Sequence, residues 1–209
     1  MSDDAFFSVL EQKLANGTIS AKEKIALANW LADAVHDEDR AVQLFHEMID
    51  EDPRNVWARY WLAYFLYVRY PLGGEEALLK AKSLLEVRSE DEDCSSASMV
   101  LLLNIENLLR RENNLGEEDI HHSMEVVQKA TDMRPEWPNH HHHLASLYQR
   151  TRQYDGELVE LQRAQSLLYG KDVEVDPLDF DFEELVTGRT SQVTRHLIEK
   201  RLRQITGTP

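Results

Sequence analysis

The sequence of 209 residues contains a single cysteine, Cys94. One cysteine excludes an intramolecular disulfide and argues against a cysteine-based metal site. No apolar run approaches the roughly 18–20 residues that a membrane-spanning helix needs. Residues 1–7 are acidic, whereas a secretory signal opens with a basic stretch. These absences lead us to expect a cytoplasmic protein.

Familiar catalytic motifs are also absent. The sequence has no glycine-rich phosphate loop, no His-Glu-x-x-His and no Gly-x-Ser-x-Gly. We therefore predict neither an enzyme nor a bound cofactor. Basic residues are few, with 23 Lys and Arg against 38 Asp and Glu and a net charge of -15. Because nucleic-acid phosphates require clustered basic side chains, we expect no nucleic-acid partner. The acidity fits a basic protein partner, but it also fits a merely well-solvated surface.

An internal repeat lies at an offset of 82 residues. Small, large and proline positions of one segment recur at corresponding places in the other. The first series is Ala41, Phe45, Met48, Pro53, Leu62, Ala63 and Leu66. The second series is Ser123, Val127, Ala130, Pro135, Leu144, Ala145 and Tyr148. Seven matches at one offset indicate repeated structural units.

The spacing within each series predicts a pair of helices. Ala41, Phe45 and Met48 fall on one helical face. The proline that follows ends this helix, because it lacks an N–H and disfavours helical geometry in the residue before it. A second helix then begins, and Leu62 and Ala63 lie in its buried stripe. The small alanine permits two helices to approach closely.

This pattern resembles the tetratricopeptide repeat (TPR), a helix–turn–helix unit with a usual period of 34 residues. An offset of 82 then corresponds to two units with about 14 inserted residues, which we place at 71–74, 89–93 and 113–116. The resemblance implies an all-α, right-handed helical-repeat solenoid of about four helix pairs. A solenoid needs capping elements at both ends because a bare terminal repeat exposes its apolar face.

We assign the four pairs to residues 21–52, 55–88, 95–134 and 139–169. A Ser20-x-x-Glu23 capping box starts the first pair, and Gly170 is the expected C-cap of the last. The predicted division is an N-terminal capping helix at 1–19 and a repeat array at 20–170. An acidic extended segment at 171–189 and a basic amphipathic helix at 190–209 follow.

The resemblance implies that the leading helix of each pair lines a concave groove. In the second pair the groove positions are aromatic, and the start of that helix adds two polar residues: Trp57, Tyr60, Tyr64, Tyr67, Arg54 and Asn55. The corresponding positions 82 residues later are polar: Asn139, His142, Ser146 and Gln149. Aromatic rings suit stacking on proline or apolar side chains of a bound peptide.

Other interpretations of these surfaces remain open. The aromatic face of residues 57–67 suits a foreign partner, the chain's own C-terminal segment or a second copy in a homodimer. The segment 177–185 alternates acidic and large apolar residues, which fits either packing across the solenoid or recognition. It lacks the loop spacing of an EF-hand, so calcium binding is not predicted. The helix at 190–205 fits a docked cap or contact with an anionic partner.

Four consecutive histidines at 140–143 invite a metal hypothesis, with His121 and His122 as further ligands. Successive helical side chains point about 100° apart, so four in a row cannot converge on one ion. The two groups also begin antiparallel helices, which places them near opposite ends. We therefore predict no metal site and assign His142 to the groove.

The sequence thus predicts a protein–protein interaction module, an adaptor or scaffold that binds a peptide or protein in the groove. Within the same class, an acidic chaperone, inhibitor or immunity-type protein for a basic client is the alternative. A metal-responsive protein and a self-assembling structural protein are the alternatives from other classes.

Overall fold

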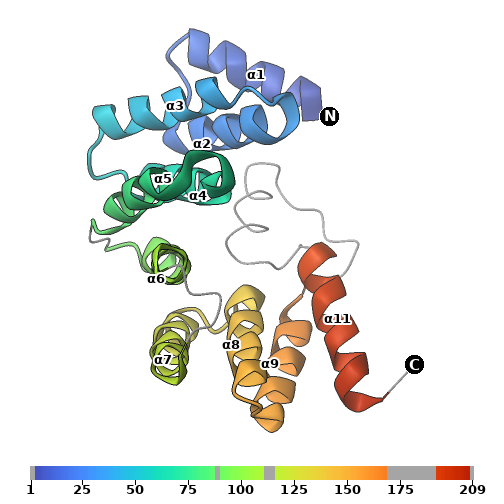
Figure 1. Ribbon diagram of the computed structural model, residues 1–209. Helices are drawn as coiled ribbons and strands as arrows, with labels where there is room; N and C mark the ends of the chain where they lie inside the picture. Colours follow the sequence, from blue (N-terminus) through green and yellow to red (C-terminus); the bar gives the residue numbers. More distant parts are fainter. Residues whose placement is uncertain (1–2, 88–89, 111–115, 169–191, 208–209) are drawn as a thin grey trace. The chain divides into compact units, whose positions relative to one another are not determined.

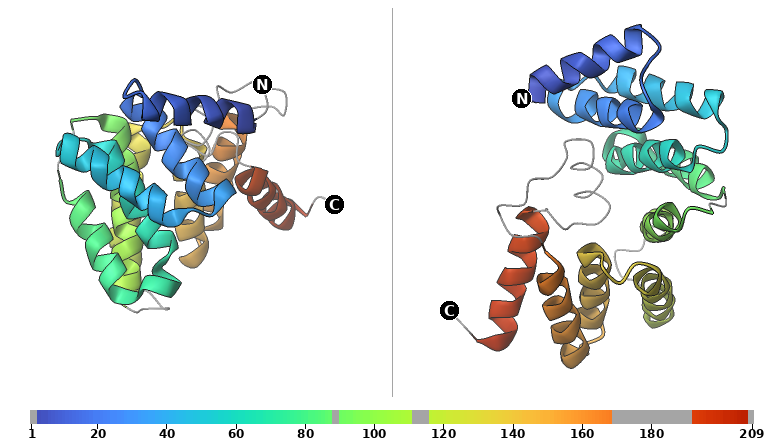
Figure 2. Two further views of the ribbon diagram at one scale, coloured as in Figure 1. Left: turned by 90° about the horizontal axis from the view of Figure 1, so that it is seen from above. Right: turned by 180° about the vertical axis from the view of Figure 1, so that it is seen from behind.

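A computed structural model describes residues 3–87, 90–110, 116–168 and 192–207 (Figures 1 and 2). The regular elements of these ranges are all helices, with no strand among them. The chain divides into two compact units, Met1–Ser89 and Glu90–Pro209. Each unit is a succession of helices in which sequence neighbours pack against each other. The predicted all-α class of helix pairs is confirmed.

The first unit contains five α-helices: α1 (Asp3–Ala15), α2 (Ala21–Trp30), α3 (Glu38–Glu51), α4 (Val56–Val68) and α5 (Tyr70–Leu85). A π-helical turn, η1 (Leu31–Val35), extends α2 and ends at His36, whose φ of 60° is left-handed. The second unit contains α6 (Glu92–Leu109), α7 (Glu117–Met133), α8 (Pro138–Arg150), α9 (Tyr154–Leu167) and α11 (Gln192–Thr206). Gly170, the expected C-cap, lies outside the described residues.

Side-chain caps mark where α2 and α4 of the first unit begin. The predicted capping box of α2 is present: Ser20 Oγ accepts from the Glu23 amide at 3.3 Å, and Glu23 Oε2 accepts from the Ser20 amide at 2.8 Å. Lys13 of α1 also donates to Glu23, so the box joins two helices. These hydrogen bonds lower the pKa of Glu23 to about 2, with that from Lys13 contributing most. Asn55 caps α4 by accepting from the Ala58 amide at 3.0 Å.

The insertion predicted at 71–74 is a helical turn followed by a kink, and not a plain loop. Residues 70–73 form the first turn of α5, with Pro71 near its start, where the missing N–H costs little. The backbone then breaks at Gly74, whose φ is 64° and ψ is -161°. Such a conformation is open to glycine and strained for other residues. The extra residues therefore add one helical turn before the kink in α5.

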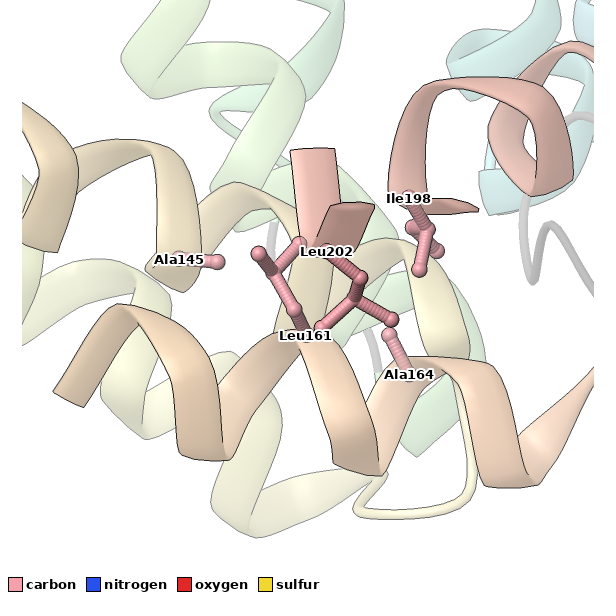
Figure 3. Close-up of a cluster of buried hydrophobic side chains, with 5 residues drawn as sticks. All are labelled: Ala145, Leu161, Ala164, Ile198 and Leu202. Atoms are coloured by element: carbon pink, nitrogen blue, oxygen red, sulfur yellow. The ribbon is translucent and has the colours of Figure 1, made fainter. Parts of the chain in front are cut away.

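Small side chains line the contacts between helices, as the repeat pattern predicted. Ala63 of α4 and Ala41 of α3 have no exposed surface, and Ala145 of α8 is 2% exposed. Large neighbours fill the remaining space, among them Phe45, Met48 and Leu62. In the second unit one cluster joins α6, α7 and α8 through Leu103, Val127, Leu144 and Leu147. A second cluster joins α8, α9 and α11 through Ala145, Leu161, Ala164, Ile198 and Leu202 (Figure 3).

The buried alanines at these helix contacts, Ala41, Ala63 and Ala145, form what we call the alanine seam. Replacing Ala63 by leucine tests it directly. The larger side chain has no space at a fully buried position, so we expect a loss of about 1–3 kcal/mol in the free energy of unfolding. The control is Ala15→Leu at an exposed position of α1, with an expected change within about 0.5 kcal/mol. Urea unfolding followed by circular dichroism measures both. Equal stability of the two variants would contradict close packing at Ala63.

Candidate interaction surfaces

Aromatic side chains cover one side of α4, while the opposite side of the helix enters the core through Ala58, Leu62 and Ala63. Trp57 and Tyr60 meet edge to face with ring centroids 5.6 Å apart. The series continues through the buried Trp61, which lies 5.4 Å from Tyr60 and 5.9 Å from Tyr64, again edge to face: a row of four rings, Trp57, Tyr60, Trp61 and Tyr64.

The predicted aromatic groove residues differ in exposure. Trp57, Tyr64 and Tyr67 are half-buried, and burial raises the pKa of the Tyr67 phenol. Tyr60 is only 5% exposed, so it serves the packing of the first unit. Trp61, which the sequence analysis left out of the groove, is 1% exposed and links Tyr60 to Tyr64. We refer to Trp57, Tyr64 and Tyr67 as the α4 aromatic face.

The two polar residues predicted beside this face have separate roles. Arg54 is exposed. Asn55 is half-buried, and its side-chain oxygen caps α4, so this oxygen already has a partner. Of the two, the Arg54 guanidinium therefore offers the accessible polar group at the start of the helix.

The polar surface of α8 consists of Asn139, His142, Ser146 and Gln149. Asn139 and His142 are half-buried, and Ser146 and Gln149 are exposed. Burial lowers the pKa of His142, which favours the neutral ring. Ser146 Oγ donates to the carbonyl of His142 at 3.0 Å. With its amide oxygen turned toward α11, Gln149 accepts from Arg201 Nη2 at 3.0 Å.

The histidines of α8 act mainly as internal hydrogen-bonding groups. His140 is 2% exposed, and its Nε2 lies 2.7 Å from Ser96 Oγ, which itself donates to the Ala130 carbonyl at 3.1 Å. The hydroxyl and ring thus connect α6, α7 and α8. Desolvation, with smaller contributions from His143 and His141, lowers the pKa of His140 to about 3. The ring is therefore neutral at neutral pH.

His141 also has a defined structural role. Its Nδ1 lies 2.6 Å from Glu160 Oε2 and its Nε2 lies 2.8 Å from the Pro135 carbonyl oxygen. The imidazole therefore joins the turn before α8 to α9. Desolvation lowers the pKa of the neighbouring His143 to about 4. In the part of the chain that the structure describes, no group of three or more His, Cys, Asp or Glu side chains could hold a metal ion.

A buried ion pair joins α9 to α11. Glu157 is 1% exposed and accepts from Arg201 at both carboxylate oxygens, at 2.5 Å from Nε and 3.0 Å from Nη2. The sequence analysis missed this pair. A signal was present, because Glu157 precedes Leu161 and Ala164 by four and seven residues and so shares their buried stripe.

Comparison with known proteins identifies the fold class. No protein family model and no curated protein matches the chain. A solved structure, the thermophilic TPR protein TTC0263 of Thermus thermophilus, is 18% identical with a TM-score of 0.55, over 90% of this chain and 93% of that one. Looser similarities are found to YrrB, described as a TPR protein with an unusual peptide-binding site, at 13% identity and a TM-score of 0.48 over 95% and 93% of the chains. A MamA RS-1 double mutant matches at 19% identity and 0.47 over 80% and 96%.

The fold is therefore that of helical-repeat proteins. In particular, it is the TPR fold, as the repeat pattern predicted. No helix in the described ranges is both long enough and apolar enough to span a membrane. Contact of the α4 aromatic face or the α8 polar surface with a partner stays a prediction.

Breaking the Glu157–Arg201 pair from one side leaves a buried carboxylate without its partner. Breaking a fully buried pair from one side costs about 3–5 kcal/mol in the free energy of unfolding. Because the Arg201 side chain is partly exposed, we expect Arg201→Gln to cost less than this range. Replacing both residues, Glu157→Leu with Arg201→Met, should restore most of the loss because no charge remains buried. Thermal or urea unfolding measures the difference. A double variant as unstable as Arg201→Gln would show that the buried charge is not the cause.

Acid should destabilise the protein partly through His140. Its ordinary pKa is 6.5 and its folded value is about 3, so its contribution is complete above pH 6.5 and is lost as the pH falls toward 3. We expect His140→Gln, which keeps an N–H for Ser96, to make the decline between pH 6.5 and 4 shallower. The exposed His122→Gln is the control and should leave the decline unchanged. Urea unfolding at a series of pH values gives both slopes, and identical slopes would refute the assignment.

Proposed function

We propose that the protein is an interaction module that holds a peptide or protein segment on the leading helices of its repeat pairs. The contact residues are those of the α4 aromatic face and, in the second unit, the polar surface of α8. The proposal includes a cytoplasmic adaptor or scaffold role without catalysis, nucleic acid or cofactor.

The observation that carries this proposal is the partial exposure of three large rings on one side of α4. The opposite side of that helix is fully buried, through Ala58, Leu62 and Ala63. Packing of the first unit buries Tyr60 and Trp61 on the aromatic side as well, but it leaves the three rings beside them partly exposed. Half-buried Trp and Tyr side chains supply large contact areas at a low cost in conformational entropy, as recognition surfaces do.

The two surfaces, one in each unit, favour different chemical groups in what each of them binds. Rings on α4 suit proline or aliphatic side chains. On α8, the hydroxyl of Ser146 and the neutral ring of His142 suit hydrogen bonds to backbone or polar groups of a partner. The net charge of -15 favours partners with basic residues, and Arg54 offers a local exception beside the rings.

A peptide library displayed on phage and selected on the full chain tests this function. Peptides that bind the wild type should lose about tenfold or more in affinity for the Trp57→Ala, Tyr64→Ala double variant, because two stacking contacts are removed. The matched control is Tyr154→Ala, which removes an aromatic ring that is 54% exposed on α9. Circular dichroism checks that the variants fold.

The salt dependence of the binding affinity distinguishes recognition by the aromatic face from recognition by charge. Binding led by the aromatic face should change little between low and high salt, whereas binding of a basic client through charge should weaken steeply. Selected peptides that bind the double variant and the wild type equally well would contradict the assignment of the α4 aromatic face. A steep salt dependence in those same peptides would favour the acidic chaperone or inhibitor alternative.

A further inference from the structure

A cleft of about 450 Å³ lies between α9 and α11 in the second unit, and we call it the α9/α11 cleft. The two helices lie side by side (Figures 1 and 2) and run antiparallel, because Arg201 near the end of α11 meets Glu157 near the start of α9. The volume falls within the range of about 300–1,000 Å³ that is typical of ligand sites. Both helices contribute to the lining: Gln162 and Gln165 from α9, and Glu199, Leu202, Arg203 and Thr206 from α11.

Most polar side chains of this lining have unused hydrogen-bonding groups within the described part of the chain. The carboxamides of Gln162 and Gln165 make no hydrogen bond there, and the Glu199 carboxylate has no ion-pair partner. The Arg203 guanidinium donates only from Nε, to the Glu199 carbonyl at 3.3 Å, and meets no carboxylate. Thr206 differs, because its hydroxyl donates to the Leu202 carbonyl at 2.9 Å. Four side chains that can bind a polar ligand therefore line one cleft.

The α9 wall of the cleft suits an extended peptide backbone. A carboxamide donates through its NH₂ group and accepts through its oxygen, so it can bond to both the N–H and the C=O of a peptide. Gln162 and Gln165 are about 4.5 Å apart along the helix axis, which lets both contact one extended chain that runs along the cleft. A helical ligand would not use them, because its backbone groups are already paired with one another. Leu202, which is 9% exposed, adds an apolar contact (Figure 3).

The α11 wall carries one charge of each sign. Glu199 and Arg203 are four residues apart, so they are separated by about 6 Å along the axis of α11. In an extended chain, residues i and i+2 point to the same side and lie about 6.6–6.8 Å apart, whereas adjacent residues point to opposite sides. An acidic and a basic residue two positions apart therefore match this wall, and an adjacent pair does not.

We propose that the α9/α11 cleft is a binding site for an extended peptide segment that carries an acidic and a basic residue two positions apart. Arg203 pairs with the acidic side chain and Glu199 with the basic one. Gln162 and Gln165 bond to the backbone of the segment. This site uses no residue of the α4 aromatic face or of the α8 polar surface, so it adds a function to the one proposed above.

The first test compares two peptides of identical composition by nuclear magnetic resonance of the isotope-labelled full chain. The spaced peptide is acetyl-Thr-Thr-Glu-Thr-Lys-Thr-Thr-amide, and the adjacent peptide is acetyl-Thr-Thr-Glu-Lys-Thr-Thr-Thr-amide. We expect the spaced peptide to cause saturable shifts in the side-chain amide signals of Gln162 and Gln165. The adjacent peptide should bind about three- to fivefold more weakly, because it can satisfy only one of the two partly exposed charges.

The second test removes the charges of the cleft one at a time. Arg203→Gln and Glu199→Gln should each weaken binding of the spaced peptide by about three- to fivefold. The matched control is Lys200→Gln, which removes a charge at an exposed position of the same helix outside the lining. This control should bind the spaced peptide as the wild type does.

The third test changes the preference of the cleft. Glu199→Arg leaves two basic side chains on the α11 wall, so this variant should prefer the acidic peptide acetyl-Thr-Thr-Glu-Thr-Glu-Thr-Thr-amide over the spaced peptide. The wild type should show the opposite preference. His196→Arg adds positive charge at an exposed position outside the lining and should keep the preference of the wild type.

Several results would overturn the proposal. These are no shift of the Gln162 and Gln165 side-chain amides, equal affinity for the spaced and adjacent peptides, or an equal loss on Lys200→Gln and Arg203→Gln. Equal shifts on addition of free glutamate and lysine would assign the cleft to amino acids instead. The peptide comparison on the wild type needs no substitution, so it stands even if a variant disturbs α11. The Trp57→Ala, Tyr64→Ala variant should bind the spaced peptide as the wild type does, which separates this test from that of the α4 aromatic face.

Discussion

Close packing of helices at buried alanines is the constraint on which the rest of the structure depends. Ala41, Ala63 and Ala145 leave almost no surface exposed, and larger side chains from neighbouring helices close around them. On α4 the side away from Ala63 carries the half-buried Trp57, Tyr64 and Tyr67, although Tyr60 and Trp61 beside them are buried. Packing at Ala63 therefore sets the position of the helix that carries the α4 aromatic face.

The second unit adds buried polar groups to the same scheme. Ser96 and His140 connect three helices, and Glu157 and Arg201 hold α11 on α9. Burying such groups costs desolvation, which their hydrogen-bond partners within the chain offset. The Glu157 carboxylate accepts from the Arg201 guanidinium of α11 at both of its oxygens. Apolar packing of Ile198 and Leu202 and the Glu157–Arg201 ion pair together hold α11 against α8 and α9.

The sequence predicted most of the fold because its determinants are local. The capping box at Ser20, the prolines between helices and the alanine spacing each act within a few residues, and the structure has them as predicted. Groups whose environment depends on distant parts of the chain were not predictable in the same way. The 5% exposure of Tyr60 and the partner of Glu157, 44 residues away, require knowledge of packing between helices. The kink at Gly74 was expected only as a longer turn, because proline and glycine indicate a break without giving its geometry.

Hydrogen–deuterium exchange of the full chain, with and without a selected peptide, tests the central claim most directly. The claim is that the seam fixes α4 in the core and leaves its aromatic face for a partner. Exchange should be slow through residues 58–63 in the free protein because all of these residues except Arg59 have buried side chains. On peptide binding, added protection should appear in α4 around Trp57 and Tyr64. Fast exchange of residues 58–63 in the free protein, or peptide-induced protection confined to helices other than α4 and α8, would contradict it.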